Sequence, residues 1–217
     1  MTLRLDGVRS MVVFAAHPDD AEIGAGGLLL ALAATSPGLR VRSVVFSGSP
    51  SRRSEAQVAA AAFLPGADVT LDQHELADGR LPASWADVKA IVQQCAAGEP
   101  PDLVLAPRPD DAHQDHRLLG ELASQAFRGP LLLHYEIPKW DGDLRPPNVY
   151  VRLAEEDARR KVELLHRCFS SQAQRQWWDE EVFCGLMRLR GMESRSRYAE
   201  GFVSHKLLVD LDAGIAG

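Results

Sequence analysis

Two clusters of histidine and aspartate carry the residue types that bind metal ions and move protons. The first is His-Pro-Asp-Asp at positions 17–20, and the second spans positions 110–116. An imidazole nitrogen and a carboxylate oxygen are both good zinc ligands, so His17 and Asp20 suit a metal ion. The side chains of neighbouring aspartates tend to point in different directions. One of Asp19 and Asp20 can therefore bind the ion while the other faces a water molecule beside it.

The second cluster adds imidazole groups. His113 and His116 are three residues apart, so on a helical turn they share one face. For either cluster the alternative is a polar helix N-terminus, because aspartate is common in turns and at N-caps. That alternative explains a single aspartate, but it does not explain two such clusters, each following a buried apolar run. The pattern therefore favours a functional site.

The elements around the clusters alternate in type. Strands are expected at the short apolar runs 11–16, 41–46, 67–71, 103–106 and 131–134. Helices are expected between them, at 23–34, 51–64, 83–97 and 116–127. This alternation predicts an α/β fold, a Rossmann-like three-layer sandwich with a mostly parallel sheet. Ligands of such sheets bind outside the carboxyl ends of the strands, so the two clusters should meet at one edge.

The remainder of the chain is less regular. Residues 137–147 hold three prolines and are expected to form a long ordered loop. We then expect a strand at 148–153, helices at 154–169 and 180–192, and a closing edge strand at 204–211.

Three glycines in the first predicted helix suggest a second interpretation, a dinucleotide-binding turn. Gly24, Gly26 and Gly27 follow a strand, but the sixth position counted from Gly24 is Leu29 rather than glycine. The second strand also ends without the acidic residue that holds a ribose. Close packing of the helix on the sheet is the better explanation of these glycines.

Composition bounds the class of protein. A chain of 217 residues suits a single domain, here 1–217, with a full core and no disulfides. The formal net charge of -6 does not favour binding to nucleic acid. No apolar run approaches the length of a membrane span. The three cysteines lack metal-finger spacing and residues 1–10 lack a signal-peptide pattern, so we expect a cytoplasmic protein. A homo-oligomer is compatible with the sequence.

The two clusters together resemble the signature of the PIG-L/LmbE-like zinc-dependent N-deacetylase family, as His-Pro-Asp-Asp at 17–20 and His-Gln-Asp-His at 113–116. Supporting family motifs are matched at Arg52 with Glu55, at Asp78-Gly79, at Ser171-Gln172 and at residues 198–202. The similarity extends over most of the chain.

The resemblance implies one zinc ion, Zn2+, held by His17, Asp20 and His116. It implies Asp19 as the general base, His113 as the group that stabilises the oxyanion and protonates the leaving amine, and Asp115 as a carboxylate that orients a motif histidine. We further expect Asp115 to raise the pKa of His113 and to fix its orientation.

The sequence departs from the family pattern beside the second cluster. Gln114 stands where a proline is frequent, and Asp111 stands where several members carry a tyrosine that contacts the oxyanion. Both departures concern the oxyanion geometry rather than the metal ligands.

The resemblance also implies the substrate, a small-molecule acetamido sugar or sugar conjugate of the N-acetylglucosamine type. Arg52 is expected to contact this substrate, with a pair to Glu55 as the alternative. Asp78 is either a turn residue or an acceptor for a sugar hydroxyl, and Trp140 either stacks on a sugar or anchors its loop. The loops at these positions should open onto the metal-binding edge and also offer Glu136.

Three other functions remain open from the sequence. The first is hydrolysis of another N-acyl metabolite on the same metal site. The second is a metal-dependent phosphoesterase, which usually needs two metals and hence more ligands than these clusters supply. The third is a catalytically silent carbohydrate-binding module on the same fold. Asp19 argues against the third, because a binding module needs no base beside its metal.

Overall fold

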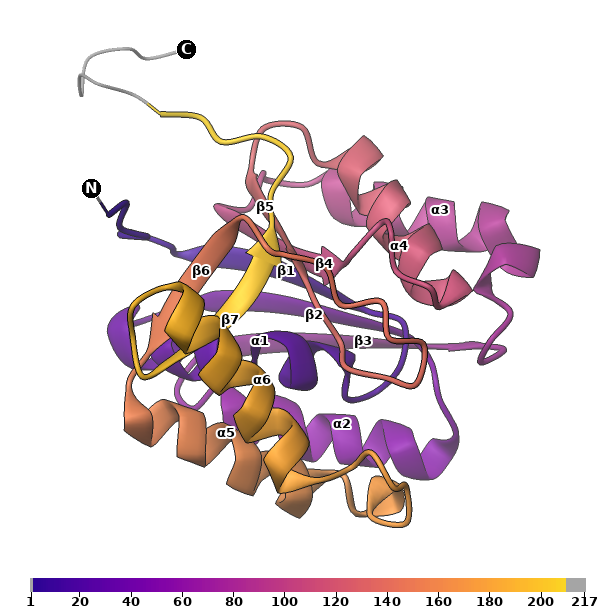
Figure 1. The fold of residues 1–217 in the computed structure, drawn as a ribbon. Coiled ribbons are helices and arrows are strands. Elements are labelled where there is room, and N and C mark those ends of the chain that lie inside the picture. The colour runs from indigo at the N-terminus through magenta and orange to yellow at the C-terminus, as the bar shows by residue number, and fades with distance from the viewer. Residues whose placement is uncertain (1, 210–217) are drawn as a thin grey trace.

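A computed structural model describes residues 2–209 as a seven-stranded sheet with helices on both faces (Figure 1). The strands are β1 Ser10–Ala15, β2 Arg40–Ser47, β3 Asp68–Leu76, β4 Leu103–Pro107, β5 Leu131–Tyr135, β6 Val149–Leu153 and β7 Tyr198–Val203. The helices are α1 Asp20–Thr35, α2 Pro50–Phe63, α3 Trp85–Ala96, α4 Gln114–Ala126, α5 Glu155–Cys168 and α6 Glu180–Glu193. Two short 3-10 turns lie at Leu81–Ser84 and Ser170–Gln172.

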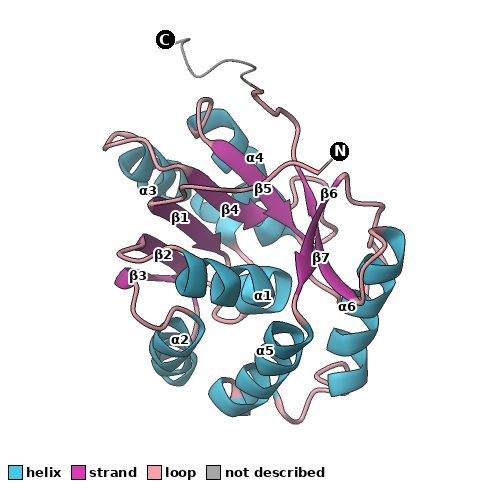
Figure 2. Cartoon of the chain, turned by 90° about the vertical axis from the view of Figure 1, so that its left-hand side faces the viewer, coloured by secondary structure: helices cyan, strands magenta, loops and turns pink. Residues whose placement is uncertain are grey.

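The helices form one layer on each face of the sheet (Figure 2). Helices α1, α2, α5 and α6 cover one face, and their core includes Phe63 and Met187. Helices α3 and α4 cover the other face, where the core includes Leu119. Strand β1 supplies Val13 to the first core and Phe14 to the second, because successive side chains of a strand point to opposite faces. The predicted three-layer α/β fold is confirmed.

The strand order places the two clusters next to each other. The order is β3-β2-β1-β4-β5-β7-β6, with β1 to β5 parallel and β7 antiparallel to both of its neighbours. Strand β1 has β2 on one side and β4 on the other, which reverses the direction in which strands are added. In open α/β sheets ligands bind beside such a reversal. The loops that leave β1 and β4 here carry the two histidine–aspartate clusters.

The sequence predicts the first five strands and the helices between them to within a few residues, apart from β3, which is longer than expected. Residues 137–147 contain no helix or strand, as expected for that loop. None of the helices in residues 2–209 combines the length and apolar character needed to span a bilayer. The extent of the domain over 1–217 stays a prediction.

The predicted closing strand at 204–211 is wrong. Within residues 2–209 the last strand is β7, which lies inside the sheet with β6 at the edge beside it. Residues 204–209 form no strand, and 210–211 lie outside the described residues. The apolar run that suggested a strand is exposed, with Leu208 at 72%. In β7 the charged Glu200 interrupts the apolar pattern, yet it is buried because it finds polar partners in the core.

Candidate active site

The turn after β1 is backbone-strained. Asp19 occupies the N-cap position of α1 with a φ of 118°, a conformation that residues other than glycine rarely adopt. Such a backbone costs roughly 1–3 kcal/mol and is typical of functional sites, where the surroundings over-determine it. The backbone N–H of His17 donates to Asp20 Oδ2 over 2.8 Å and closes the turn. The side chains of His17, Asp19 and Asp20 are all buried.

Three donor groups converge beside this turn, and we call them the donor triangle: His17, Asp20 and His116. His17 Nδ1 lies 3.2 Å from His116 Nε2 and 3.4 Å from Asp20 Oδ2, and His116 Nε2 lies 3.3 Å from Asp20 Oδ1. Ligands about 2.1 Å from a tetrahedral ion are separated by about 3.4 Å, so these spacings fit one zinc ion. Helix α4 supplies His116 from the second cluster, and α1 supplies Asp20 from the first.

Further ligand types surround the donor triangle. His17, His113 and His116 have ligand atoms within 4.8 Å of one another, and so do His17, Asp78 and Asp115. In the second group both carboxylates face His17 Nε2, with Asp78 Oδ1 at 3.1 Å and Asp115 Oδ2 at 3.3 Å. A metal-binding imidazole usually directs its second ring nitrogen at a carboxylate. We therefore interpret this side of His17 as its orienting contact.

Asp115 is held rigidly for that contact. It is fully buried, its Oδ2 accepts the Gly79 N–H over 2.8 Å, and its Oδ1 accepts the Leu81 N–H over 3.0 Å. These bonds fasten the loop after β3 to the start of α4. The motif histidine that the carboxylate meets is His17.

His113 has a different environment from the one expected. Its Nδ1 accepts the backbone N–H of Asp115 over 3.2 Å as the N-cap of α4, which leaves Nε2 as the free ring nitrogen. Its ring stacks on His116 with the centroids 4.5 Å apart. Burial lowers the pKa of His113, positive charge on His116 and His17 lowers it further, and the attraction of Asp115 does not offset them. Asp115 raises the pKa of His113 as expected, but the net pKa is lowered because burial and the charges of His116 and His17 have the larger effect.

Asp111 is a site residue whose contact with a predicted ligand the sequence analysis missed. It is buried, and its Oδ2 lies 3.3 Å from His116 Nδ1 without the alignment of a hydrogen bond. Lys139 Nζ binds Asp111 Oδ2 at 3.0 Å and Asp143 Oδ2 at 2.8 Å, so the loop after β5 is fastened to this carboxylate. Burial opposes a charged His116, but Asp20 and Asp111 outweigh it and raise its pKa to about 9. The adjacent aspartates at 110–111 were the available signal in the sequence.

Asp19 pairs with an arginine from α2. Arg52 Nη2 lies 2.8 Å from Asp19 Oδ2 in an ion pair and donates to the Pro18 carbonyl over 2.5 Å. Burial raises the pKa of Asp19 to about 7, the charge of Arg52 opposes this rise, and the charge of Asp20 adds to it. A carboxylate with a pKa near 7 suits a general base at neutral pH.

A family match covers the elements that carry these residues. The sequence model of one protein family, described as PIG-L, GlcNAc-PI de-N-acetylase, matches residues 12–127. This match covers more than half of the chain and includes both clusters. The chain belongs to the PIG-L family. The resemblance drawn from the sequence motifs is thus confirmed.

Solved structures share the fold of this PIG-L family member. N,N'-diacetylchitobiose deacetylase from Pyrococcus horikoshii, complexed with its inhibitor MPG, is 22% identical with a TM-score of 0.73, and the match covers 91% of this chain and 84% of that one. The conserved protein TT1542 from Thermus thermophilus is 24% identical with a TM-score of 0.72, over 97% and 100%. GalB, the 4-carboxy-2-hydroxymuconate hydratase from Pseudomonas putida, is 20% identical with a TM-score of 0.69, over 95% and 100%. A search of curated proteins finds no match.

The residues predicted to contact substrate differ in how the PIG-L fold places them. Arg52 lies against Asp19, so its guanidinium already has a partner in the site. Asp78 lies beside His17 and keeps 61% of its side chain exposed. Trp140 is 69% exposed on the loop after β5 and follows the residue that binds Asp111. Glu136 does not open onto the site, because it is buried in an ion pair with Arg190.

Proposed function

We propose that this protein is a zinc-dependent N-deacetylase that removes the acetyl group of an N-acetylated amino sugar or sugar conjugate, of the N-acetylglucosamine type. The observation that carries the proposal is the donor triangle with Asp19, an acid of pKa about 7, next to it in the chain. The description of the matching family names a GlcNAc-linked substrate, and one structure of the same fold is named a deacetylase of N,N'-diacetylchitobiose.

His17, Asp20 and His116 would hold the zinc ion. When bound, zinc supplies the Lewis acidity that polarises an amide carbonyl and lowers the pKa of water. Asp20 suits a cation because it stays ionised at neutral pH. Burial alone would raise the pKa of Asp20, but the charges of His116 and His17 outweigh it and lower that pKa well below the usual value.

Asp19 and His113 would move the protons of the reaction. Asp19 would accept a proton from the attacking water as the new carbon–oxygen bond forms. His113 has its free Nε2 to direct at the oxygen that gains negative charge. The negative charge on this oxygen would raise the pKa of His113, which is lowered in the free protein, and so favour its protonated form. The carbon–nitrogen bond would then break as this proton passes from His113 to the nitrogen, which releases the free amine and acetate.

Arg52, Asp78 and Trp140 would recognise the sugar. Asp78 suits a hydroxyl donor because its carboxylate is exposed and its pKa is lowered by its hydrogen bond with His17. Trp140 offers an exposed aromatic face for stacking. Arg52 has a buried Nε without a partner among the described residues, so it retains a donor beside its pair with Asp19.

The fold alone does not decide the reaction, because one structure of the same fold is named a hydratase. The deciding experiment is an acetate-release screen of the zinc-loaded protein with N-acetylglucosamine, its oligosaccharides and its nucleotide conjugates. We expect release from at least one of them, and none from protein stripped with a chelator. If the protein cleaved simple acylated amines but no acetamido sugar, the assignment as an amidohydrolase would stand and the assignment of a sugar substrate would be wrong.

Metal stoichiometry tests the ligand set independently of substrate. Alanine at His17, Asp20 or His116 should abolish stoichiometric zinc binding or weaken it severely. His166→Ala is the matched histidine control, because that side chain is exposed on α5. Asp78→Ala should retain zinc and raise KM or lower kcat/KM. Full zinc retention in all three ligand variants would contradict the assignment.

A further inference from the structure

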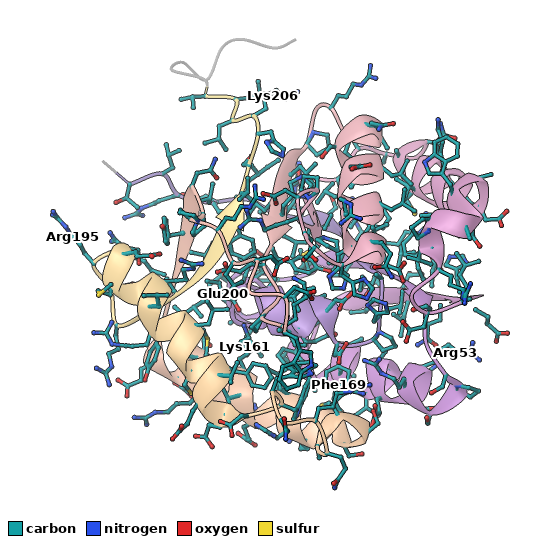
Figure 3. All side chains as sticks on the ribbon, turned by 45° about the vertical axis from the view of Figure 1, so that its right-hand side comes forward. Arg53, Lys161, Phe169, Arg195, Glu200 and Lys206 are labelled. Carbon is teal, nitrogen blue, oxygen red and sulfur yellow. The ribbon has the colours of Figure 1, made fainter. Side chains whose placement is uncertain are left out.

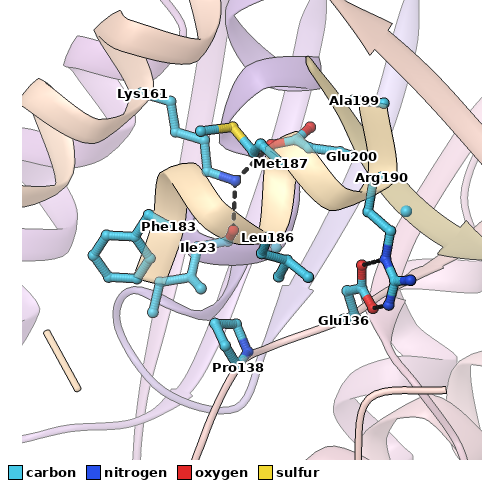
Figure 4. A pocket seen from close by; sticks show the side chains of 12 residues that line it. Ile23, Glu136, Pro138, Lys161, Phe183, Leu186, Met187, Arg190, Ala199 and Glu200 are labelled. Carbon is cyan, nitrogen blue, oxygen red and sulfur yellow. Dashed lines mark hydrogen bonds and ion pairs between the residues drawn. The ribbon is translucent and has the colours of Figure 1, made fainter. Parts of the chain in front are cut away.

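A buried ion pair lies between α1, α5 and β7. Lys161 on α5 and Glu200 on β7 are each 3% exposed, and their charged groups are 2.7 Å apart (Figure 3). Glu200 belongs to the motif at 198–202, to which the proposed chemistry gives no role. The pair lines a small cavity together with side chains of α6 (Figure 4). Because desolvation of both charges is costly, a buried ion pair is by itself weak evidence for a role in stability.

The polar contacts of this pair are to the backbone of α1. Glu200 accepts the N–H of Gly27 through Oε1 and the N–H of Leu28 through Oε2, each over 2.8 Å. Lys161 Nζ donates to the carbonyl of Ile23 over 2.6 Å. In a regular α-helix the Gly27 N–H donates to that same Ile23 carbonyl. The ion pair is therefore inserted beside one rung of the hydrogen-bond ladder of α1, which is a recognised cause of local helix distortion.

Glycine makes this approach to the helix backbone feasible. A Cβ atom at Gly27 would lie 3.2 Å from Glu200 Oε1 and 2.5 Å from Leu153 Cδ1. At Gly26 a Cβ atom would lie 3.1 Å from Lys161 Cγ. Two of the three glycines that the sequence analysis attributed to close packing are thus the positions where the ion pair reaches α1.

The adjacent hydrogen bond of α1 leads directly to the strained turn of the active site. The N–H of Ile23 donates to the carbonyl of Asp19 over 2.9 Å, while the carbonyl of Ile23 accepts from Lys161. One residue, Ile23, therefore links the Lys161 contact to the backbone carbonyl of the proposed base. Asp20, a member of the donor triangle, is the first residue of the same helix. Any axial shift of α1 would move both aspartates together.

We propose that Lys161 and Glu200 are positioning residues that hold the first turn of α1, and with it Asp19 and Asp20, in the geometry needed for metal binding and catalysis. The proposal rests on the proposed function for its kinetic part only. A second buried ion pair of the same cavity, Glu136 with Arg190, joins the loop after β5 to α6 and has no hydrogen bond to α1. The backbone contacts of Lys161 and Glu200 are what distinguish a positioning role.

The test compares Lys161→Met and Glu200→Gln with Met187→Ala. Met187 is 2% exposed on α6 and lines the same cavity, so its truncation destabilises the core without removing a polar contact to α1. Zinc affinity is measured on each full-length protein by competition with a chromophoric chelator, and kcat and KM are measured on the zinc-loaded proteins. We expect about 10-fold weaker zinc binding and a kcat about 10- to 100-fold lower at similar KM in the two polar variants. Met187→Ala should lower Tm while both properties stay near wild type.

The outcomes separate the two proposals. Zinc affinity equal to wild type in folded Lys161→Met and Glu200→Gln would overturn the positioning role, whatever substrate the enzyme uses. If Met187→Ala lost zinc affinity to the same extent at a matched fall in Tm, the effect would be general destabilisation and the proposal would also fail. If Lys161→Met does not fold, Glu200→Gln decides alone, because it keeps the side-chain shape and one acceptor for the α1 amides. Absence of deacetylation in the wild-type enzyme would contradict the proposed function and leave the zinc measurement intact.

Discussion

Replacing Arg52 by alanine should shift the pH dependence of turnover to higher pH. Arg52 lies 2.8 Å from Asp19 Oδ2, and its charge opposes the effect of burial, which otherwise raises the pKa of Asp19. An opposite charge at this distance lowers a carboxyl pKa by about 1–3 units, so its removal should raise the pKa of Asp19 by that amount. The base must be ionised to act, and the acidic limb of the kcat profile should therefore move upward.

The expected loss of kcat at neutral pH in Arg52→Ala follows from the pKa of Asp19. With a pKa of about 7, half of the Asp19 groups are ionised at pH 7. A rise of about 1–3 units would reduce the ionised fraction, and hence kcat at pH 7, by roughly 5- to 500-fold. Bound zinc would lower the starting pKa of Asp19, and the same loss of roughly 5- to 500-fold is then expected at the pH of the wild-type midpoint instead of at pH 7.

Arg52→Lys is the matched control, because it keeps the positive charge but not the two-pronged guanidinium. We expect the acidic limb of Arg52→Lys to stay close to that of the wild type. Arg52→Ala should recover most of its activity at high pH, where Asp19 is ionised. The assay is acetate release over pH 5–10, with zinc content measured for each protein. If Arg52→Ala raises KM while its acidic limb stays in place, then Arg52 serves the substrate alone and the reasoning about Asp19 fails.

Two further predictions address the base and the metal ligands. Asp19→Asn should lower turnover by about two to four orders of magnitude while zinc content stays near wild type, and full activity in this variant would assign the base elsewhere. Zinc affinity of the metal-free protein should rise with pH up to at least about pH 9, because Asp20 and Asp111 outweigh burial and raise the pKa of His116 to about 9. The proton of His116 must leave before zinc binds, and so must that of His17, whose pKa is held well above its usual value by Asp20 and Asp115 against the effect of burial. Chelator competition at several pH values measures this, and an affinity independent of pH between 6 and 8 would argue against His116 as a ligand.

The alternation of strands and helices and the convergence of the two clusters were determined by the sequence itself. Apolar periodicity is a local property, and it located β1, β4 and the helices that follow them. Once both strands are parallel members of one sheet, their carboxyl ends share an edge, so 17–20 and 113–116 must approach each other. The two clusters could therefore be paired without coordinates, whereas the choice of His116 over His113 as the ligand beside His17 came from the resemblance to the family. The strand β7 was missed because Glu200 interrupts its apolar pattern.

The partners of the polar side chains were decided only by the tertiary structure. Asp115 faces His17 across 98 positions of the chain, although the sequence analysis linked it to the pKa of His113, two residues away. Glu200 reaches the backbone of Gly27 across 173 positions. A carboxylate can serve a neighbour, a distant histidine or a helix backbone with the same chemistry, and no local pattern distinguishes these outcomes. Packing of the layers decides them, because burial makes every charged group depend on whichever partner the fold brings within reach.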